Sequence, residues 1–411
     1  MSATNSFFLL LPCILLLTTT GCNSQQNAPE KSNAASTGKL NGRAFREGKD
    51  YVVFERIRVL DKAGFDKPAE AFSLLLPKGW SHEGEIMWTA PGNSCAGTNQ
   101  YFRATSPDGK NSFEIMPAFL WSWSFNATLR QMQQGLPTSK YCTYAQPMDA
   151  EQYLRNVFVP RDIGNPEIVS VKPNPSVVQV MQQKNNETRN ELMRYGAMNV
   201  QFHQTAVNAR LRWSDKTEGI ALCGVSIIES MVANQYNGTY DRQATSQASH
   251  IIVFKYPAGQ NKQAEEMLTV IMGSIRTNPY WQTTVNDFWR NVREQKHIVH
   301  VGKIRMMDAQ TRAMGEAAIR AGNERLKSMD VQMRNWERQQ RSQDRMHTNF
   351  IKAIREVENY RDETGRIEMA AGYDHAWSRS DGSSFIMSND PNFDPSAVFL
   401  DPRWKEMKRT D

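Results

Sequence analysis

Hydrophobic and polar residues alternate along several stretches of the first 260 positions. This period of two is typical of β-strands with one buried face. We expect strands at residues 51–61, 71–80, 84–90, 98–125, 199–213, 219–232 and 249–257. The fourth stretch is interrupted by Ser106-Pro107-Asp108-Gly109, a turn sequence that predicts a β-hairpin.

Helical periodicity appears between and after these strands. We expect amphipathic helices at residues 127–134, 150–157, 177–195 and 263–278. The order is strands, helices, further strands and a closing helix. That order predicts an α+β fold in which helices cover a mostly antiparallel sheet.

The chain changes character after these elements. Residues 282–362 carry apolar residues at several spacings of seven, which predicts a helical arm, as an extended helix or helical hairpin with coiled-coil character. Residues 363–411 place Gly and Pro between short runs, and Ser380-Asp381-Gly382 predicts a β-hairpin in a small C-terminal module. This module is too small for a core of its own, so Trp377 is expected to pack on the helix around Phe350.

An apolar run at residues 7–17 precedes small residues and Cys22. The run is about half the roughly 20 residues that a spanning helix needs, and its length is typical of a signal peptide. Thr19-Thr20-Gly21-Cys22 resembles the lipobox of bacterial lipoproteins. The resemblance implies a signal peptide over residues 1–22 and a palmitate-bearing anchor on Cys22. The alternatives are an ordinary secretory signal and an apolar N-terminus without a targeting role.

Residues 23–48 are polar and small, which predicts a flexible linker between the anchor and the first domain. Asn23 follows the lipidated cysteine. Among bacterial lipoproteins this favours the outer membrane, facing the periplasm. The membrane, reached through the lipid, and other envelope proteins are therefore the expected partners.

A second resemblance lies at the two ends of the first domain. Residues 72–80 (FSLLLPKGW) and 106–117 (SPDGKNSFEIMP) are similar to the opening of PsbP-like domains, and residues 256–281 resemble their close. The resemblance implies a PsbP-like domain with an insertion over residues 49–281. That family consists mostly of binding and assembly factors and supplies no catalytic residues. The C-terminal tail resembles tails of uncharacterised bacterial proteins.

The net charge is +6, and its excess lies in one segment. Residues 281–361 hold 16 Lys and Arg against 10 Asp and Glu, so the rest of the chain is balanced. Such a segment can face an anionic membrane or nucleic acid. Its mixed signs favour a solvated helix instead, and nucleic acid is not an expected partner.

Five cysteines are present, of which Cys13 and Cys22 fall in the signal peptide. In an oxidising envelope compartment two of the remaining three can pair. Cys95 and Cys142 lie in loop-like sequences, and we expect them to form a disulfide. Cys223 lies in an apolar strand and is expected to be buried and reduced.

Aromatic residues mark the candidate binding surfaces. Phe119, Trp121, Trp123 and Phe125 alternate on one face of a strand, where aromatic rings either stack on sugars or fill a core. The alternation favours a core, and a ligand or partner surface at Trp121, Trp123 and Trp377 remains the alternative.

No metal or cofactor motif is found. Asp390, Asn392 and Asp394 resemble the start of a calcium loop, but Pro395 stands where that loop requires glycine, so a turn is favoured. The pair His297 and His300 is too small for a zinc site. No phosphate-binding loop, dinucleotide fingerprint or nucleophile elbow occurs.

These patterns favour a non-catalytic bacterial envelope lipoprotein that acts as a binding or assembly module, without a cofactor. The alternative is a secreted hydrolase that acts on envelope glycan or peptide. That alternative requires a deep pocket with two carboxylates about 5 to 10 Å apart.

Overall fold

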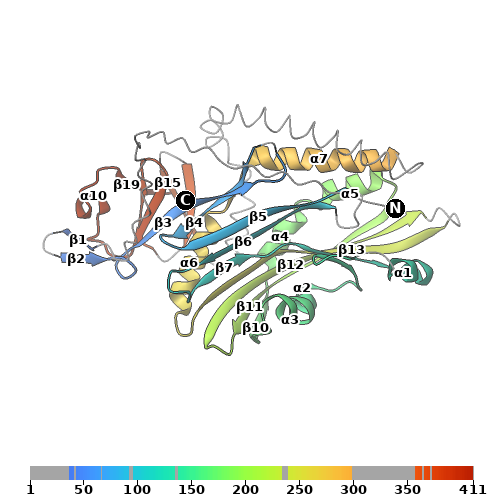
Figure 1. Ribbon diagram of the computed structural model, residues 1–411, viewed down its shortest axis with the longest axis horizontal. Helices are drawn as coiled ribbons and strands as arrows, with labels where there is room; N and C mark the ends of the chain where they lie inside the picture. Colours follow the sequence, from blue (N-terminus) through green and yellow to red (C-terminus); the bar gives the residue numbers. More distant parts are fainter. Residues whose placement is uncertain are drawn as a thin grey trace, which may run out of the picture. The chain divides into compact units, whose positions relative to one another are not determined.

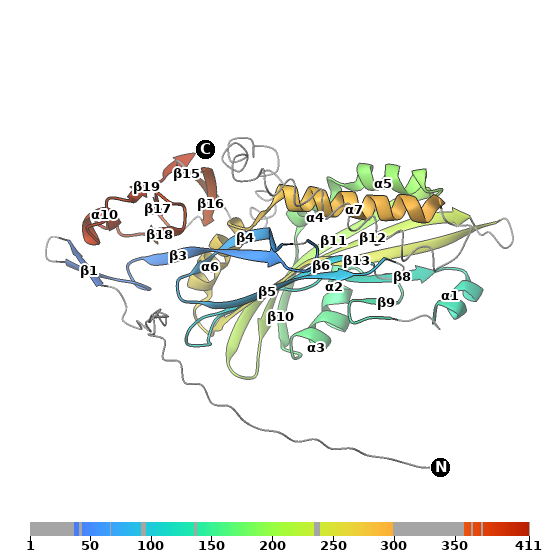
Figure 2. The same ribbon diagram turned by 45° about the horizontal axis from the view of Figure 1, so that its top comes forward.

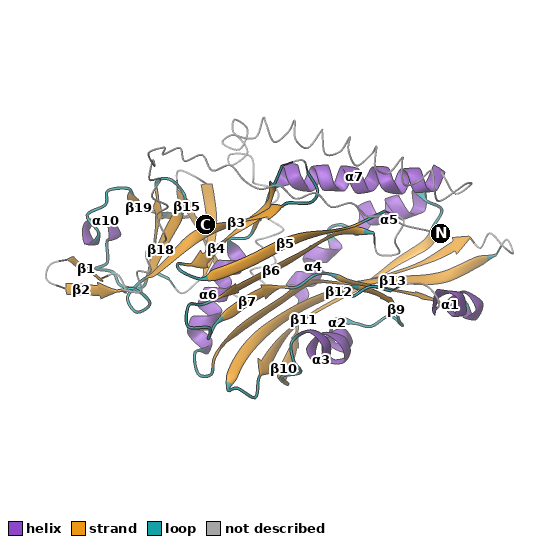
Figure 3. Ribbon diagram, in the orientation of Figure 1, coloured by secondary structure: helices purple, strands orange, loops and turns teal. Residues whose placement is uncertain are grey.

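The computed structural model describes residues 37–40, 43–65, 67–91, 96–134, 138–233, 239–298, 357–362, 365–370 and 373–410. Strands make up 48% of these residues and helices 25%, so β-structure dominates (Figures 1 and 3). Nearly all strand pairs are antiparallel, and the exception is the short pair β8–β9.

The larger sheet has nine strands in the order β10-β11-β12-β13-β7-β6-β5, with β8 beside β13 and β9 beside β8. Its strands are β5 (Ser81–Thr89), β6 (Gly97–Thr105), β7 (Ser112–Ile115), β8 (Phe119–Ser124), β9 (Cys142–Tyr144), β10 (Glu167–Pro173), β11 (Met198–Arg212), β12 (Thr217–Ala233) and β13 (Tyr240–Pro257). The long strand β13 pairs with β7 in its second half and with β8 in its first half.

The second sheet has six strands in the order β14-β4-β3-β18-β17-β19. They are β3 (Val52–Asp61), β4 (Ala69–Pro77), β14 (Arg276–Thr277), β17 (His375–Arg379), β18 (Ser384–Ser388) and β19 (Trp404–Glu406). Two small sheets complete the β-structure, formed by β1 (Thr37–Leu40) with β2 (Arg43–Arg46) and by β15 (Val357–Asp362) with β16 (Gly365–Ala370) and β20 (Lys408–Thr410).

Helices cover both faces of the larger sheet. One face carries α4 (Pro175–Gln182), α5 (Asn185–Arg194) and α7 (Pro279–Ile298), and the other carries α2 (Ala150–Tyr153), the π-helical turn η1 (Leu154–Phe158) and α3 (Val159–Asp162) (Figure 2). The remaining helices are α1 (Ala127–Gln134), α6 (Asn261–Gly273) and α10 (Pro395–Val398). Ion pairs Arg194–Glu294 and Arg293–Glu191 join α5 to α7.

The two faces of the larger sheet bury separate cores. One core combines Phe102 and Phe254 with Leu74 of β4, Leu268 of α6 and Trp281 of α7. The second core, on the other face, consists of stacked rings and aliphatic residues of α2, η1 and the sheet, including Trp121, Tyr153, Phe158, Val207 and Cys223. Burial on both faces explains why β12 is apolar almost continuously from Ile220 to Val225.

The fold class predicted from the sequence is wrong. It assumed a helix-covered, PsbP-like sheet domain, then a long helical segment and a separate C-terminal hairpin module. Among the described residues, α7 covers residues 282–298 of the predicted arm and ends at Ile298, whereas Val357–Asp362, which the prediction made helical, form strand β15. Residues 299–356 of that arm, with Phe350, lie outside the described part.

The predicted C-terminal module is not separate either. Its hairpin β17–β18 pairs through β18 with β3, so strands from both ends of the chain share one sheet. The physical reason is that a two-stranded hairpin is only marginally stable alone, and the open edge of β3 provides hydrogen-bond partners and an apolar face. Sequence alternation predicts strands but does not say which of them pair.

The predicted linker also contributes to this region. Phe45 of β2 is 1% exposed and contacts Phe393 edge to face, with the ring centroids 5.2 Å apart. Tyr51 stacks on the same ring at 4.7 Å. The N-terminal strands are therefore anchored to the C-terminal tail by aromatic packing.

Candidate functional site

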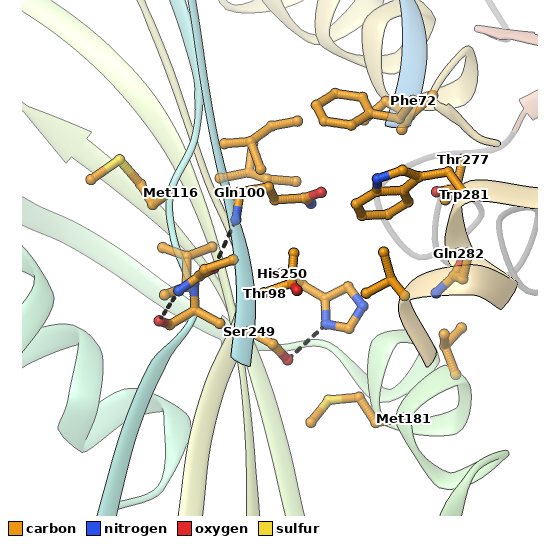
Figure 4. A pocket seen from close by; sticks show the side chains of 18 of the residues that line it. Phe72, Thr98, Gln100, Met116, Met181, Ser249, His250, Thr277, Trp281 and Gln282 are labelled. Atoms are coloured by element: carbon orange, nitrogen blue, oxygen red, sulfur yellow. Dashed lines mark hydrogen bonds between the residues drawn. The ribbon is translucent and has the colours of Figure 1, made fainter. Parts of the chain in front are cut away.

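A pocket of about 520 Å³ lies against the face of the larger sheet that carries α4 and α7 (Figure 4). Its volume falls within the range of small-molecule sites. Apolar side chains supply much of the lining, among them Phe72, Ile115, Met181, Met272, Trp281 and Val285. Polar residues at the same pocket include Thr98, Gln100, Lys184, His250, Gln282 and Asn286.

A β-bulge places His250 at this pocket. Ser249 pairs with Gly224 and Ile252 pairs with Leu222, so two residues of β13 oppose the single residue Cys223 of β12. The His250 backbone has φ of 54°, in the left-handed region that few residues other than glycine adopt. A bulge of this kind turns a side chain out of the regular alternation, and bulges are common beside functional sites.

The bulge also reverses which residues of β13 face each core. Ala248, Ile251 and Val253 bury against the second core, whereas Ile252, Phe254 and Tyr256 belong to the first. Without the extra residue, Ala248 and Ile252 would share a face. His250 belongs to neither core and is exposed to water at the pocket. In Figure 4 its ring lies between Trp281 and Met181.

Protein surrounds the His250 ring although water reaches it. Burial among protein atoms and, next, the nearby Lys184 ammonium lower the pKa of His250 to about 4. The imidazole is therefore neutral at pH 7. Its Nδ1 lies 3.0 Å from Ser249 Oγ. When Ser249 donates this hydrogen bond, the proton of the neutral ring lies on Nε2.

Asn99 on β6 also lines the pocket and is hydrogen-bonded to Ala118, another lining residue. Its side-chain Nδ2 donates to the Ala118 carbonyl at 2.8 Å, and its Oδ1 accepts from the Ala118 amide at 2.8 Å. These bonds fix the segment between β7 and β8, where β13 changes partner. Met116 donates its amide to Ile251 O at 2.8 Å, directly beside the bulge.

Asp61, at the end of β3, holds the part of α7 that lines the pocket. The Trp281 Nε1 donates to Asp61 Oδ2 at 2.9 Å, which orients the indole that lines the pocket. The Trp289 Nε1 donates to Thr98 Oγ1 at 2.7 Å and joins α7 to β6. The walls are thus set by hydrogen bonds between distant segments, which makes the pocket largely preformed.

The lining determines which chemistry the pocket supports. Among the described residues that line it, none is Asp or Glu, so the carboxylate pair of a glycoside hydrolase is missing there. Ser249 and His250 form a serine–histidine contact. A histidine with a pKa of about 4 accepts a proton poorly at neutral pH. A catalytic triad also needs an acidic residue beside the histidine, and the described lining contains none. The arrangement is suited to binding.

The candidate surface residues named from the sequence lie elsewhere. Trp121 is 1% exposed, stacks on Tyr153 at 5.5 Å and donates Nε1 to Gln146 O at 3.1 Å. Trp123 is half-buried, with the Arg130 guanidinium 5.0 Å from its ring centroid. Trp377 is 5% exposed and contacts Phe393 edge to face. The structure brings none of the three to the pocket.

Two cysteines can be placed. Cys142 is disulfide-bonded, whereas Cys223 is reduced and fully buried. Cys95 lies outside the described residues, so its pairing with Cys142 stays a prediction. Cys22 and the whole signal peptide also lie outside them.

The Asp-rich turn of the tail has structural partners. Asp390 Oδ1 accepts the Asn392 amide at 3.0 Å, and Asp394 caps α10 by accepting from Ser396 N at 2.9 Å. In the described part of the chain, no group of three or more His, Cys, Asp or Glu side chains is placed to hold a metal ion. No helix among the same residues is long and apolar enough to cross a membrane.

His250, Lys184 and the pocket were not predicted from the sequence. One signal was available, because the alternation of small or apolar residues in β13 slips by one position at Ser249-His250. Such a slip inside a strand pattern indicates a bulge. Lys184 offered no signal, since its place at the pocket depends on how α4 and α5 pack on the sheet.

No protein-family model matches the chain, and neither a curated protein nor a solved structure does. The residues of the pocket therefore carry the functional argument.

Proposed function

We propose that the chain is a non-catalytic envelope lipoprotein whose sheet domain binds a small, largely apolar molecule in the pocket beside His250. The observation that carries this proposal is the pocket of about 520 Å³, with many apolar side chains, a few convergent polar groups and no described carboxylate in its lining. Apolar walls supply the binding free energy and the polar groups orient the ligand.

Dye binding tests the pocket. The probe is N-phenyl-1-naphthylamine, a neutral dye that fluoresces in apolar surroundings, added to the full chain carrying Cys22→Ser so that no acyl chain competes. We expect saturable binding that Gln282→Trp weakens at least tenfold, because the indole occupies the pocket. Thr283→Trp, at the neighbouring exposed position outside the pocket, is the matched control and should bind as the parent does. Unchanged dye affinity in Gln282→Trp contradicts the proposal.

The anchor is tested separately. The lipobox-like residues before Cys22 support attachment through acyl chains, and two or three such chains hold a protein firmly at a membrane. Cys22→Ser should release the protein into the periplasmic fraction, while Cys13→Ser should leave it with the outer membrane. A Cys22→Ser protein that sediments with membranes in high salt would exclude the lipoprotein assignment.

The second candidate is a secreted hydrolase of envelope glycan or peptide. It is favoured by the Ser249–His250 contact alone. The lowered pKa of His250 opposes it, because the neutral imidazole is a weak base. A fluorophosphonate probe distinguishes the two candidates. Covalent labelling of Ser249, lost in Ser249→Ala, would replace the binding proposal by the hydrolase.

A further inference from the structure

A second cavity, of about 240 Å³, lies beside α7 and is separate from the pocket at His250. Its described lining comes from residues 63–65, from residues 88–91 at the end of β5, and from α7. The described linings of the two cavities share no residue. We call this second cavity the aromatic slot.

Three aromatic rings line the aromatic slot. Trp88 of β5 and Trp289 of α7 stack with their ring centroids 5.9 Å apart and their planes inclined by 23°. Phe288 meets both rings edge to face, with its centroid 5.5 Å from that of Trp88 and 4.9 Å from that of Trp289. Aromatic rings prefer these two arrangements, so a further ring that enters the slot can extend the same cluster.

Hydrogen bonds and close packing hold these rings in place. The Trp88 Nε1 donates to Asp61 Oδ2 at 2.9 Å, and the Trp289 Nε1 donates to Thr98 Oγ1 at 2.7 Å. The Gly64 backbone lies directly against the Trp88 ring, because a Cβ atom at this position would be 2.4 Å from Trp88 Cζ2. Glycine alone therefore fits there without moving the indole. The slot is largely preformed, as ligand sites usually are.

The aromatic slot offers a ligand no charge and few hydrogen bonds. Its described lining contains no ionisable and no amide side chain. Both indole N–H groups already donate within the protein, and the Thr284 hydroxyl donates to Tyr280 O at 2.9 Å. A charged group or a sugar would lose its hydration there without replacement hydrogen bonds. The volume accommodates about 8 non-hydrogen atoms, if each takes about the 30 Å³ of a water molecule in the liquid.

We infer that the aromatic slot binds a free, uncharged aromatic molecule of one ring with a short substituent, about the size of benzyl alcohol. Its size follows from the volume of the slot, and its lack of charge follows from the lining. Its aromatic character follows from the rings of Trp88, Phe288 and Trp289, which attract another ring beyond the effect of burial alone. A saturated ring of equal size fits the volume but lacks this attraction. The slot does not depend on the function proposed for the pocket at His250.

Displacement of a fluorinated probe tests the aromatic slot. The probe is 4-fluorotoluene, observed by fluorine NMR with the full chain carrying Cys22→Ser and Gln282→Trp, so that the pocket at His250 is blocked. Benzyl alcohol and cyclohexylmethanol have equal numbers of non-hydrogen atoms, while benzoate and benzylammonium carry a charge. We expect benzyl alcohol to displace the probe at a concentration at least about threefold lower than cyclohexylmethanol and at least about tenfold lower than either ion. Transfer out of water alone would favour the more apolar saturated ring.

Variants locate the bound probe. Ala63→Phe should weaken probe binding at least about tenfold, because the added ring occupies the slot and removes the apolar surface that the probe would bury. Ala90→Phe, in the other lining loop, should have the same effect. Both alanines are exposed, so the variants should fold, and their urea midpoints check this. Ala127→Phe, at an exposed alanine of α1 outside the slot, is the matched control and should bind the probe as the parent does.

The contrary outcomes are distinct. Equal or stronger displacement by cyclohexylmethanol would overturn the aromatic ligand class. Unchanged probe affinity in both Ala63→Phe and Ala90→Phe would show that the probe binds elsewhere and would overturn the site. Absence of saturable probe binding to the parent would overturn both. Dye binding at the pocket beside His250 is measured separately and is unaffected by any of these results.

Discussion

The Asp61 carboxylate accepts a hydrogen bond from the Trp281 indole nitrogen at 2.9 Å, across 220 positions of the sequence. The same oxygen, Oδ2, accepts from Trp88 Nε1 at 2.9 Å, and Oδ1 accepts the amides of Ala63 and Gly64 at 3.0 and 2.8 Å. Asp61 is fully buried. One carboxylate thus joins the end of β3 to β5 and to the helix that walls the pocket.

Loss of this carboxylate should destabilise the whole described fold. Asp61→Ala leaves four donors without their acceptor, each costing about 1 to 3 kcal/mol where water cannot replace it. We expect the free energy of unfolding to fall by at least about 3 kcal/mol in urea titrations. Trp281→Phe, which removes one of these hydrogen bonds, should cost less. Glu85→Ala, on the exposed side of β5, is the control and should change the free energy of unfolding by under about 0.5 kcal/mol. An equally small change in Asp61→Ala would contradict the stabilising role of the Asp61 carboxylate.

The titration of His250 is a second prediction. Burial and the Lys184 charge lower its pKa to about 4 from the ordinary 6.5. In an NMR pH titration, the His250 Cε1 proton should shift with a midpoint near 4. Lys184→Gln should raise the midpoint, because the lysine charge opposes protonation. A midpoint near 6.5 in the parent would show that neither effect operates.

A third prediction follows for stability against pH. The unfolded chain binds a proton on this histidine below about pH 6.5 and the native chain only below about pH 4, so the unfolded state binds more protons between them. Stability should therefore decrease as the pH falls from 6.5 to 4. The loss should be smaller in His250→Asn, which carries no titrating ring. Urea midpoints at intervals of half a pH unit measure it, and identical pH profiles in the two proteins would contradict it.

The disulfide of Cys142 gives a fourth prediction. Cys142→Ser should lower the free energy of unfolding by about 2 to 4 kcal/mol, the usual effect of removing a native crosslink. Peptide mapping without reductant should link Cys142 to Cys95. Burial raises the pKa of the Cys223 thiol, so iodoacetamide should modify it only after unfolding. A peptide joining Cys142 to Cys223 would contradict both statements.

Trp377 provides the fifth prediction. Its ring packs among Phe45, Tyr51 and Phe393, so Trp377→Ala should cost about 3 to 5 kcal/mol. Because β18 pairs with β3, amide hydrogen exchange should accelerate in β3 as well as in the tail. Leu400→Ala, at a side chain that is 88% exposed, should leave exchange unchanged. Acceleration confined to the tail would instead support an independent C-terminal module.

Local patterns predicted individual elements well. The alternation at residues 51–61 falls on β3 (Val52–Asp61), and the turn at Ser106–Gly109 joins β6 to β7. The helix expected at residues 177–195 is divided into α4 and α5. The site was not predicted, because His250 reaches the pocket through a bulge and Lys184 through helix packing.

The sequence by itself determined where strands and helices form, because the spacing of apolar residues and the turn residues act over a few neighbouring positions. It also placed the lipobox-like cysteine. Only the tertiary structure decided that β18 completes the sheet of β3 and that Asp61 meets Trp281. It also decided that His250, Lys184 and Trp281 share a pocket. Each of these depends on contacts between residues far apart in the chain. The free energy that burial and hydrogen bonding contribute at such contacts depends on which surfaces of the folded chain meet.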